Sequence, residues 1–260
     1  MPRLKALLWD VDGTLAETER DGHRVAFNRA FEAIGVAWRW DESHYGELLR
    51  ISGGRERLMF DMNLRDDAPP MAERDAVARA IHAKKNAIYA ELVGSVGTPL
   101  REGVLNLMQQ CLARGVHMGI TTTTSRANLD ALMRSHLGQR WATGFAVTVC
   151  GEDVLQKKPD PEVYLQALRV LAISPLQAVA IEDAPGGVAA ARAASIPVVV
   201  TRSAYFSHVP IQGAVAVGPG LHDRRGWRPA LHAPAGEARC VDLDDIEAWC
   251  AQMDTISDHP

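Results

Sequence analysis

The chain has 260 residues, of which 47% are hydrophobic and 23% are charged, and its formal net charge is −4. A chain of this length and apolar content can bury a sizeable core, as one large domain or two smaller ones, so disorder is not expected. The slightly acidic balance argues against a broad surface for nucleic acid or for an anionic membrane. We therefore expect a small-molecule partner, and a local basic pocket for a phosphorylated compound is compatible with this composition.

The sequence also bears on the location of the protein. Its first residues lead directly into an apolar run, and no stretch of about 20 uninterrupted apolar residues follows, so we expect neither a secretory signal nor a membrane span. Four cysteines lie far apart, without a C-x-x-C pair or histidines at zinc-finger spacing: Cys111, Cys150, Cys240 and Cys250. We interpret them as reduced thiols of a cytoplasmic protein. No sequence feature indicates an oligomeric state.

The first predicted element is a buried strand at residues 4–9, which ends in two carboxylates, Asp10 and Asp12, followed by Gly13 and Thr14. In an extended backbone, side chains at positions i and i+2 point the same way, so both carboxylates should share one small volume. A hard divalent cation, or a proton on a carboxyl group with a raised pKa, relieves their repulsion. A catalytic acidic pair, an acidic turn after a strand and a calcium loop all fit this stretch alone.

The interval after this strand contains no convincing strand up to about residue 98. Helices are expected there at residues 24–34, 44–50 and 71–92. We interpret residues 16–98 as a helical cap domain inserted after the first strand, and residues 1–15 and 99–260 as the core domain.

Several side chains of this interval have a structural interpretation. Pro69-Pro70 and residues 94–99 are expected to be loop or hinge positions. The aromatic residues Tyr45, Trp38 and Trp40 are expected to pack in a core. We expect surface charge at three basic positions: Arg57, Lys84 and Lys85.

After this interval, short apolar runs alternate with helical patterns. Strands are expected at residues 116–121, 145–150, 178–181 and 197–200, with a weaker one at 214–217, and helices between them at 105–112, 129–137 and 163–171. This alternation predicts an α/β fold with a Rossmann-like parallel sheet, which binds ligands beyond the carboxyl ends of its strands. A final helix is expected at residues 242–252, and apart from the weaker strand at 214–217 no element is assigned to residues 203–236.

Three of these later strands end in residues suited to a phosphoryl group or a metal ion. They are Thr122, with Thr123 as second choice, after the second core strand, Lys158 after the third, and Glu182-Asp183 after the fourth. Each has an ordinary alternative, respectively a strand extension with a helix cap, a solvated lysine turn and an acidic N-cap. Because parallel strands share one carboxyl edge, these groups and Asp10 should converge on a single crevice.

This ordered set resembles the haloacid dehalogenase superfamily, with its DxDGT motif, strand-end threonine, Lys-Pro and Glu-Asp, and the helical insertion resembles that superfamily's C1 cap. By this resemblance, Asp10 attacks phosphorus and forms an aspartyl-phosphate. Asp12 would protonate the leaving alcohol and then activate water. Thr122 and Lys158 would bind the transferring phosphoryl group, whose transition state needs positioning and charge neutralisation.

The resemblance also implies Mg²⁺ as the cofactor. Asp10, the backbone carbonyl of Asp12, and Asp183 would hold the ion, and Glu182 would be either a ligand or an outer partner. The implied reaction is the magnesium-dependent hydrolysis of a phosphate monoester of a small sugar.

The inserted segment has a closer resemblance, to CbbY-type sugar bisphosphate phosphatases, carried by A-E-T-E at residues 16–19, His23, A-F-N at 26–28 and S-G-G-R-E-R at 52–57. This resemblance implies xylulose-1,5-bisphosphate as a plausible substrate. Arg55, with Gly53 and Gly54 beside it, would bind the second phosphate, and Thr123 would support Thr122. Glu17 and His23 would contact sugar hydroxyls or the leaving group.

Other functions stay open on the sequence alone. A phosphoglycolate phosphatase and a β-phosphoglucomutase-like phosphomutase would use the same core motifs. A phosphate-responsive binding or regulatory protein is the alternative without catalysis, because receiver domains also combine acidic residues, threonine and lysine on a parallel sheet.

Overall fold

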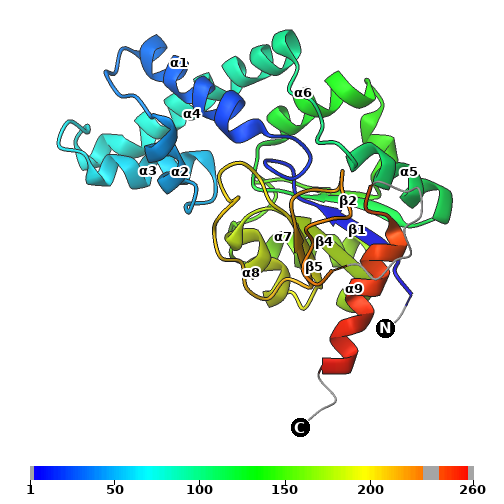
Figure 1. Cartoon of the computed structure of the whole chain (residues 1–260). Helices are drawn as coiled ribbons and strands as arrows, with labels where there is room; N and C mark the ends of the chain where they lie inside the picture. Colours follow the sequence, from blue (N-terminus) through cyan, green and yellow to red (C-terminus); the bar gives the residue numbers. More distant parts are fainter. Residues whose placement is uncertain (1–2, 231–239, 257–260) are drawn as a thin grey trace.

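The computed structural model describes residues 3–230 and 240–256, and six strands of this part of the chain form one parallel sheet (Figure 1). The sheet order is β3-β2-β1-β4-β5-β6. The strands are β1 (Ala6–Trp9), β2 (His117–Thr121), β3 (Val147–Val149), β4 (Ala178–Glu182), β5 (Val198–Thr201) and β6 (Ala216–Gly218). Strand β1 lies in the centre, paired with β2 and β4. The predicted α/β, Rossmann-like fold is confirmed.

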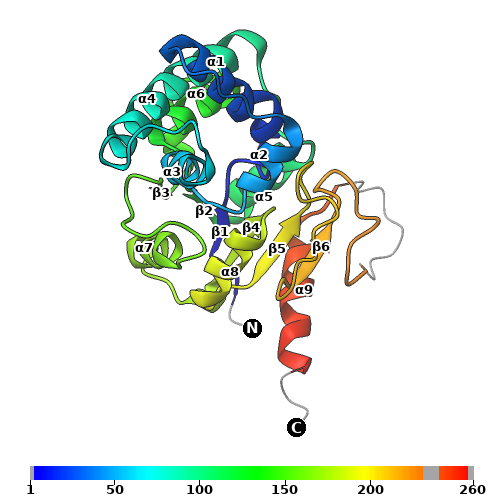
Figure 2. The same ribbon diagram turned by 90° about the vertical axis from the view of Figure 1, so that its left-hand side faces the viewer.

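Helices cover both faces of the sheet, and the alternation of side chains in β1 explains why. Leu7 and Trp9 belong to one buried hydrophobic cluster, whereas Ala6 and Leu8 belong to another on the opposite face. The first cluster includes residues of α5 (Val104–Arg114), α6 (Arg126–Leu137) and α9 (Leu243–Ile256). The second includes residues of α7 (Glu162–Leu171) and α8 (Pro185–Ala193), two helices labelled beside the sheet in Figure 2. Short 3₁₀ turns occur at Trp141–Gly144 and Pro175–Gln177.

The strand predictions differ from the structure mainly at β3, which is shorter than the expected run at 145–150. The Phe145 amide donates to the carbonyl of Ala142 and so closes the preceding 3₁₀ turn. At the other end, the Cys150 amide donates to the side chain of Asp153 at 2.8 Å. Both residues therefore lie outside the ladder, although they are buried.

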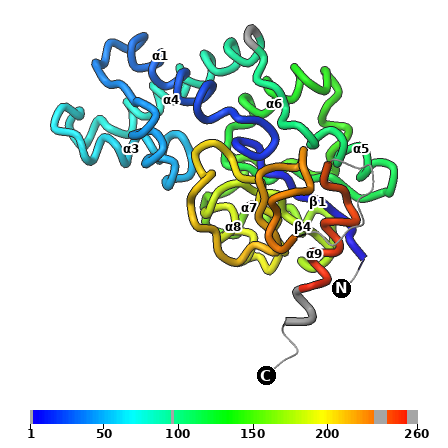
Figure 3. The backbone as a smooth tube through the Cα atoms, in the orientation of Figure 1, coloured from blue at the N-terminus to red at the C-terminus, as the bar shows by residue number. Residues whose placement is uncertain are grey.

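Residues 16–98 leave the sheet after β1 and return before α5; we call them the helical insertion (Figure 3). They contain a π-helical turn (Glu19–His23), α1 (Arg24–Ile34), α2 (Glu42–Leu48), α3 (Gly54–Leu64) and α4 (Met71–Val96). Helix α3 was not predicted, and the expected hinge at 94–96 belongs to α4. No helix in the described ranges 3–230 and 240–256 is long and apolar enough to cross a membrane.

The helical insertion has a hydrophobic cluster of its own. Phe27 lies 4.7 Å from Trp40 and 6.4 Å from Tyr45, measured between ring centroids. Trp38 is 6% exposed, and Trp40 and Tyr45 are fully buried, so the predicted core packing of these three rings is confirmed. Aromatic pairs at such distances stabilise beyond the burial of their surface, by about 0.5–1.5 kcal/mol each.

Arg101 joins the helical insertion to the core where the chain returns to the sheet. Its backbone amide donates to the carbonyl of Leu15 at 2.7 Å. Its guanidinium donates to the carbonyls of Gly13 and Arg202, the latter at 2.7 Å. One partly buried side chain thus connects the turn after β1 with the segment after β5.

Candidate functional site

The ends of the central strands bring four of the predicted side chains together. The Lys158 Nζ atom donates to Asp10 Oδ1 at 2.7 Å, to the carbonyl of Thr121 at 2.8 Å and to Glu182 Oε1 at 2.6 Å. Glu182 also accepts a hydrogen bond from the Tyr164 hydroxyl. Although burial opposes it, the neighbouring carboxylates raise the pKa of Lys158, which therefore stays charged.

Asp10, Glu182 and Asp183 form a compact group of buried carboxylates. Their ligand atoms all lie within 4.8 Å of one another. Burial raises the pKa of Asp10 to about 8 against the opposing charge of Lys158, with Glu182 adding to the increase. Burial and the charge of Asp10 also raise the pKa of Asp183. Such a set of oxygen donors suits a hard divalent cation, which would favour the ionised carboxylates.

Two glycines allow this group to be compact. Gly13 has a φ of +83°, and a β-carbon there would lie 2.0 Å from Asp183 Oδ2. A β-carbon on Gly187 would lie 1.9 Å from Glu182 Oε2. Only glycine therefore permits the backbone to approach the two carboxylates this closely.

Asp12 lies in a different environment from Asp10. Its Oδ1 atom is 2.9 Å from His23 Nε2 and accepts a hydrogen bond from the Thr18 hydroxyl. Although burial opposes it, these partners and the charge of Lys85 hold the pKa of Asp12 below its ordinary value. The two carboxylates of the DxD motif therefore have opposite pKa shifts, an arrangement that supports separate acid–base tasks.

The hydroxyl cluster after β2 presents Thr123, rather than Thr122, to the site. Thr122 is 1% exposed, and its hydroxyl accepts from the Thr124 amide at 3.1 Å. Thr123 lines both cavities described below. Of the two threonines expected at the phosphoryl group, Thr123 therefore lies in the cavity lining, whereas Thr122 is buried beneath it.

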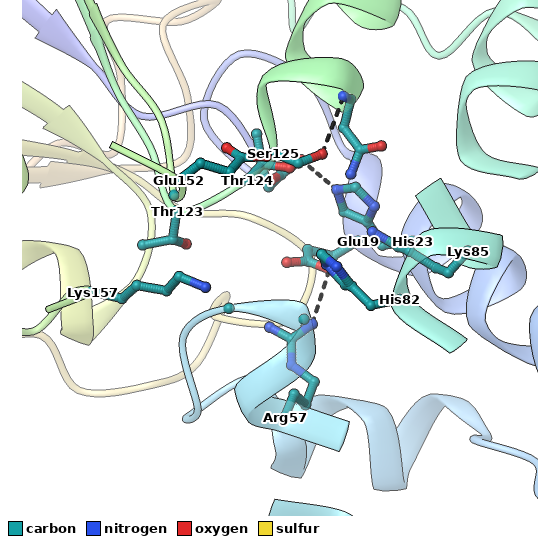
Figure 4. Close-up of a pocket in the computed structure, with 15 residues that line it drawn as sticks. Glu19, His23, Arg57, His82, Lys85, Thr123, Thr124, Ser125, Glu152 and Lys157 are labelled. Atoms are coloured by element: carbon teal, nitrogen blue, oxygen red, sulfur yellow. Dashed lines mark hydrogen bonds and ion pairs between the residues drawn. The ribbon is translucent and has the colours of Figure 1, made fainter. Parts of the chain in front are cut away.

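Two adjoining cavities open between the strand ends and the helical insertion. The larger has a volume of about 380 Å³, and its lining includes Asp10, Asp12, Lys158, Glu182 and Asp183. The smaller, of about 80 Å³, is shown in Figure 4. In this view the side chains of Arg57 and Lys157 extend toward the space beside Thr123, while Glu19 and His23 lie across it. Both cavities are lined by Asp12, Glu19, Arg57 and Thr123.

Arg57, and not Arg55, is the arginine of α3 that lines the cavities. Arg55 has a side chain that is 47% exposed and lies 3.6 Å from Asp75. Arg57 is 6% exposed and donates to the Tyr45 hydroxyl at 2.9 Å. Residues two apart on a helix are separated by about 200° around its axis, so they face opposite sides. The expected surface position of Arg57 is wrong.

The two glutamates of the A-E-T-E stretch also differ in whether they line the cavities. Glu17 is 42% exposed at its side chain and lies 3.6 Å from the Arg101 guanidinium, outside both cavity linings. Glu19 lines both cavities and accepts from the Tyr45 hydroxyl at 2.5 Å. His23 and Gly54, two of the residues expected from the sequence to bind substrate, line the smaller cavity.

Lys85 is buried, so its expected surface position is wrong, whereas Lys84 is exposed. The Nζ atom of Lys85 lies 5.0 Å from the Phe27 ring centroid and 5.3 Å from that of Tyr89. Burial lowers the pKa of Lys85 to about 8, although the charges of Asp12 and Glu19 oppose the shift. With Arg57 and Lys157, it gives the smaller cavity a cationic side.

Replacing Lys85 with methionine should stabilise the protein while impairing its activity. The pKa of Lys85 is lower in the folded chain than in the unfolded chain, so folding releases protons between pH 8 and 10.5 and stability rises across that range. At pH 7, Lys85→Met should raise the free energy of unfolding by about 1–3 kcal/mol. Urea unfolding at pH 7 and at pH 10 measures the free energy of unfolding of both proteins. The stabilisation by Lys85→Met should be smaller at pH 10 than at pH 7, and an equal difference at the two pH values would contradict the prediction.

Comparisons with known proteins identify relatives of this chain. Residues 4–195 match the family model "haloacid dehalogenase-like hydrolase". Protein CbbY of Cupriavidus necator is 41% identical over 248 residues, covering 95% of this chain and 96% of that protein. A phosphorylated carbohydrates phosphatase of Thermotoga maritima is 29% identical, covering 74% of this chain and 82% of its own length.

A solved structure shares the architecture as well as the sequence. CbbY from Rhodobacter sphaeroides in complex with phosphate has a TM-score of 0.76 and 38% identity, covering 81% of this chain and 92% of that chain. A variant of the same CbbY has been solved in complex with xylulose-1,5-bisphosphate, with a TM-score of 0.76. The prediction of an enzyme, a phosphoric monoester hydrolase, is confirmed, and the chain belongs to the haloacid dehalogenase-like hydrolase family.

Proposed function

We propose that the enzyme hydrolyses one phosphate of a small sugar bisphosphate, with xylulose-1,5-bisphosphate as the first candidate. The observation that carries this proposal is that the expected nucleophile, Asp10, and the positively charged Arg57 line the same cavity. Asp10 lies at the strand ends beside Lys158, and Arg57 lines the same cavity from α3. A bisphosphate of five carbons has one phosphate for each of these positions.

Within this proposal the core residues have separate roles. Asp10 attacks the phosphorus, and Asp12, held by His23, transfers the proton to the leaving alcohol and later takes one from water. Lys158 and Thr123 neutralise and orient the phosphoryl group. Asp10 must be ionised to attack, which a bound cation would favour, and Asp12 must carry a proton when the alcohol leaves.

The carboxylates fit Mg²⁺, as the donor set and its compactness indicate. Asp10, Asp183 and the backbone carbonyl of Asp12 would hold the ion, and Glu182, which accepts from Lys158 and Tyr164, would be an outer partner. When bound, the ion would neutralise charge on the phosphoryl oxygens. Without it, the raised pKa of Asp10 keeps this carboxyl group mostly protonated near neutral pH.

We propose that residues 16–98 act as a cap domain over a core formed by residues 1–15 and 99–260. The cap would supply the subsite for the second phosphate, through Arg57, Lys85 and the glycines Gly53 and Gly54. His23 would connect the cap to the reaction through Asp12. For Arg55 and Glu17, the exposed positions give a weaker case for substrate contact. A cytoplasmic location is part of this proposal.

Phosphate release in the presence of Mg²⁺, screened over sugar mono- and bisphosphates and phosphoglycolate, tests this function. We expect the highest kcat/KM for a pentulose bisphosphate and none without a divalent cation. A preference for phosphoglycolate would instead support the first alternative. Isomerised sugar phosphate without free phosphate would support a phosphomutase.

Exchanging the two threonines tests which hydroxyl serves the phosphoryl group. Thr123→Val should lower kcat/KM by about 10- to 100-fold, because a hydrogen bond to a charged group contributes roughly 1.5–3 kcal/mol. Thr122→Val is the matched control; it should lower the free energy of unfolding by about 1 kcal/mol and change kcat/KM by less than about threefold. A larger kinetic effect at Thr122 than at Thr123 would contradict the assignment.

A further inference from the structure

Residues 202–209, for which the sequence predicted no element, extend from the core to the helical insertion. They follow β5 and run from the sheet toward α2 (Figures 1 and 2). Arg202 holds their shape, because its Nη1 atom donates to the carbonyl oxygens of Phe206, Ser207 and Val209 at 2.9, 3.1 and 2.9 Å. A single guanidinium therefore curls this segment.

Two aromatic side chains of the segment join the hydrophobic cluster of the helical insertion. Among the described residues of that cluster, Tyr205 and Phe206 are the two that come from the core. The ring of Tyr205 lies 5.9 Å from that of Tyr45, at an interplanar angle of 59°. A β-carbon on Gly46 would lie 3.0 Å from Tyr205 Cδ1, so the segment and α2 are in close contact.

Tyr45 relates this contact to the site. Its hydroxyl donates to Glu19 at 2.5 Å and accepts from Arg57 at 2.9 Å, and both of these residues line the cavities. Tyr205 is not part of either cavity lining. Tyr205 packs on the ring of Tyr45, and the hydroxyl of Tyr45 accepts the hydrogen bond from Arg57.

Phe206 and Val209 have a more direct position, because both line the larger cavity. The same lining includes charged residues of the core, among them Asp10 and Lys158. The carbon chain of a sugar phosphate has apolar C–H groups between its charged ends, and these are favoured against an apolar surface.

We propose that residues 202–209 determine substrate specificity: Phe206 and Val209 form the wall that receives the carbon chain, and Tyr205 positions Arg57 through Tyr45. This inference rests on the proposed function and assigns the residues that contact the carbon chain of its substrate. Tyr205 is a positioning residue, since it touches neither cavity.

Kinetics of three variants test the role of Tyr205. Tyr205→Ala should raise KM for xylulose-1,5-bisphosphate about tenfold and leave kcat within about threefold, because it weakens binding of the phosphate that does not react. Tyr205→Phe should match wild type, since the Tyr205 hydroxyl has no hydrogen-bond partner among the described residues. His208→Ala, at an exposed position of the same segment, is the matched control. For p-nitrophenyl phosphate, which has no second phosphate, all variants should remain within about twofold of wild type.

Hydrogen exchange provides a readout that needs no turnover. Tyr205→Ala should accelerate amide exchange in residues 42–48, while Tyr205→Phe and His208→Ala should not. Unchanged exchange in Tyr205→Ala, or an equal rise in KM for both substrates, would overturn the inference. A wild-type enzyme that releases phosphate from no sugar phosphate would overturn the proposed function instead, and the exchange rates would still decide whether Tyr205 holds α2.

Discussion

Replacing Asp10 with asparagine should abolish turnover while the protein remains folded. The neutral amide is a poor nucleophile toward phosphorus, so kcat should fall by roughly 10³-fold or more, about 4 kcal/mol in activation free energy. Release of inorganic phosphate measures the loss, and mass spectrometry of wild type quenched with acid should detect an aspartyl-phosphate at Asp10. Activity of Asp10→Asn near the wild-type level would remove the nucleophile assignment.

The same variant should also change how stability depends on pH. The pKa of Asp10 is about 8 in the folded chain and 3.8 when unperturbed, so folding takes up a proton between these values. Without Mg²⁺, wild type should therefore lose stability as pH rises from about 4 to 8, and Asp10→Asn should lose less. Mg²⁺ should stabilise wild type more at pH 8 than at pH 5. Thermal unfolding with EDTA or Mg²⁺ measures both effects, and equal pH profiles of the two proteins in EDTA would contradict this account.

Arg57→Ala should be the most damaging change in the helical insertion for a bisphosphate substrate. Its buried guanidinium lines both cavities, so kcat/KM for xylulose-1,5-bisphosphate should fall about 100-fold, equivalent to about 2.7 kcal/mol. The loss for p-nitrophenyl phosphate should be only a few-fold. The measurement is kcat/KM for both substrates with each variant.

Arg55→Ala is the matched control, because this arginine belongs to the same helix but is exposed and lies near Asp75. It should change kcat/KM by less than about threefold. Arg57→Lys retains the charge without the planar donors, so it should fall between wild type and Arg57→Ala. Circular dichroism checks that α3 still forms. If Arg55→Ala lowers kcat/KM for the bisphosphate more than Arg57→Ala does, Arg55 and not Arg57 binds the second phosphate.

The resemblance in the inserted segment named stretches that reach the cavities, but the structure places neighbouring residues of those stretches in the lining. Arg55 and Glu17 were chosen there, whereas Arg57 and Glu19 line the cavities. Helix α3 has no clear apolar stripe, so its buried face could not be read from periodicity. Lys85 was missed because a lysine between polar neighbours is typical of a solvated surface, and only packing against aromatic rings buries it.

By itself, the sequence determined the parallel α/β core, the helical insertion after the first strand and the strand-end positions of Asp10, Lys158 and Asp183. Those predictions depend on local periodicity, and the parallel strands require that their carboxyl ends meet at one edge. Only the tertiary structure shows that Thr123 rather than Thr122, and Arg57 rather than Arg55, lines the cavities. Which side of a strand or helix faces a cavity depends on the partner packed against it, and that partner is far away in the sequence.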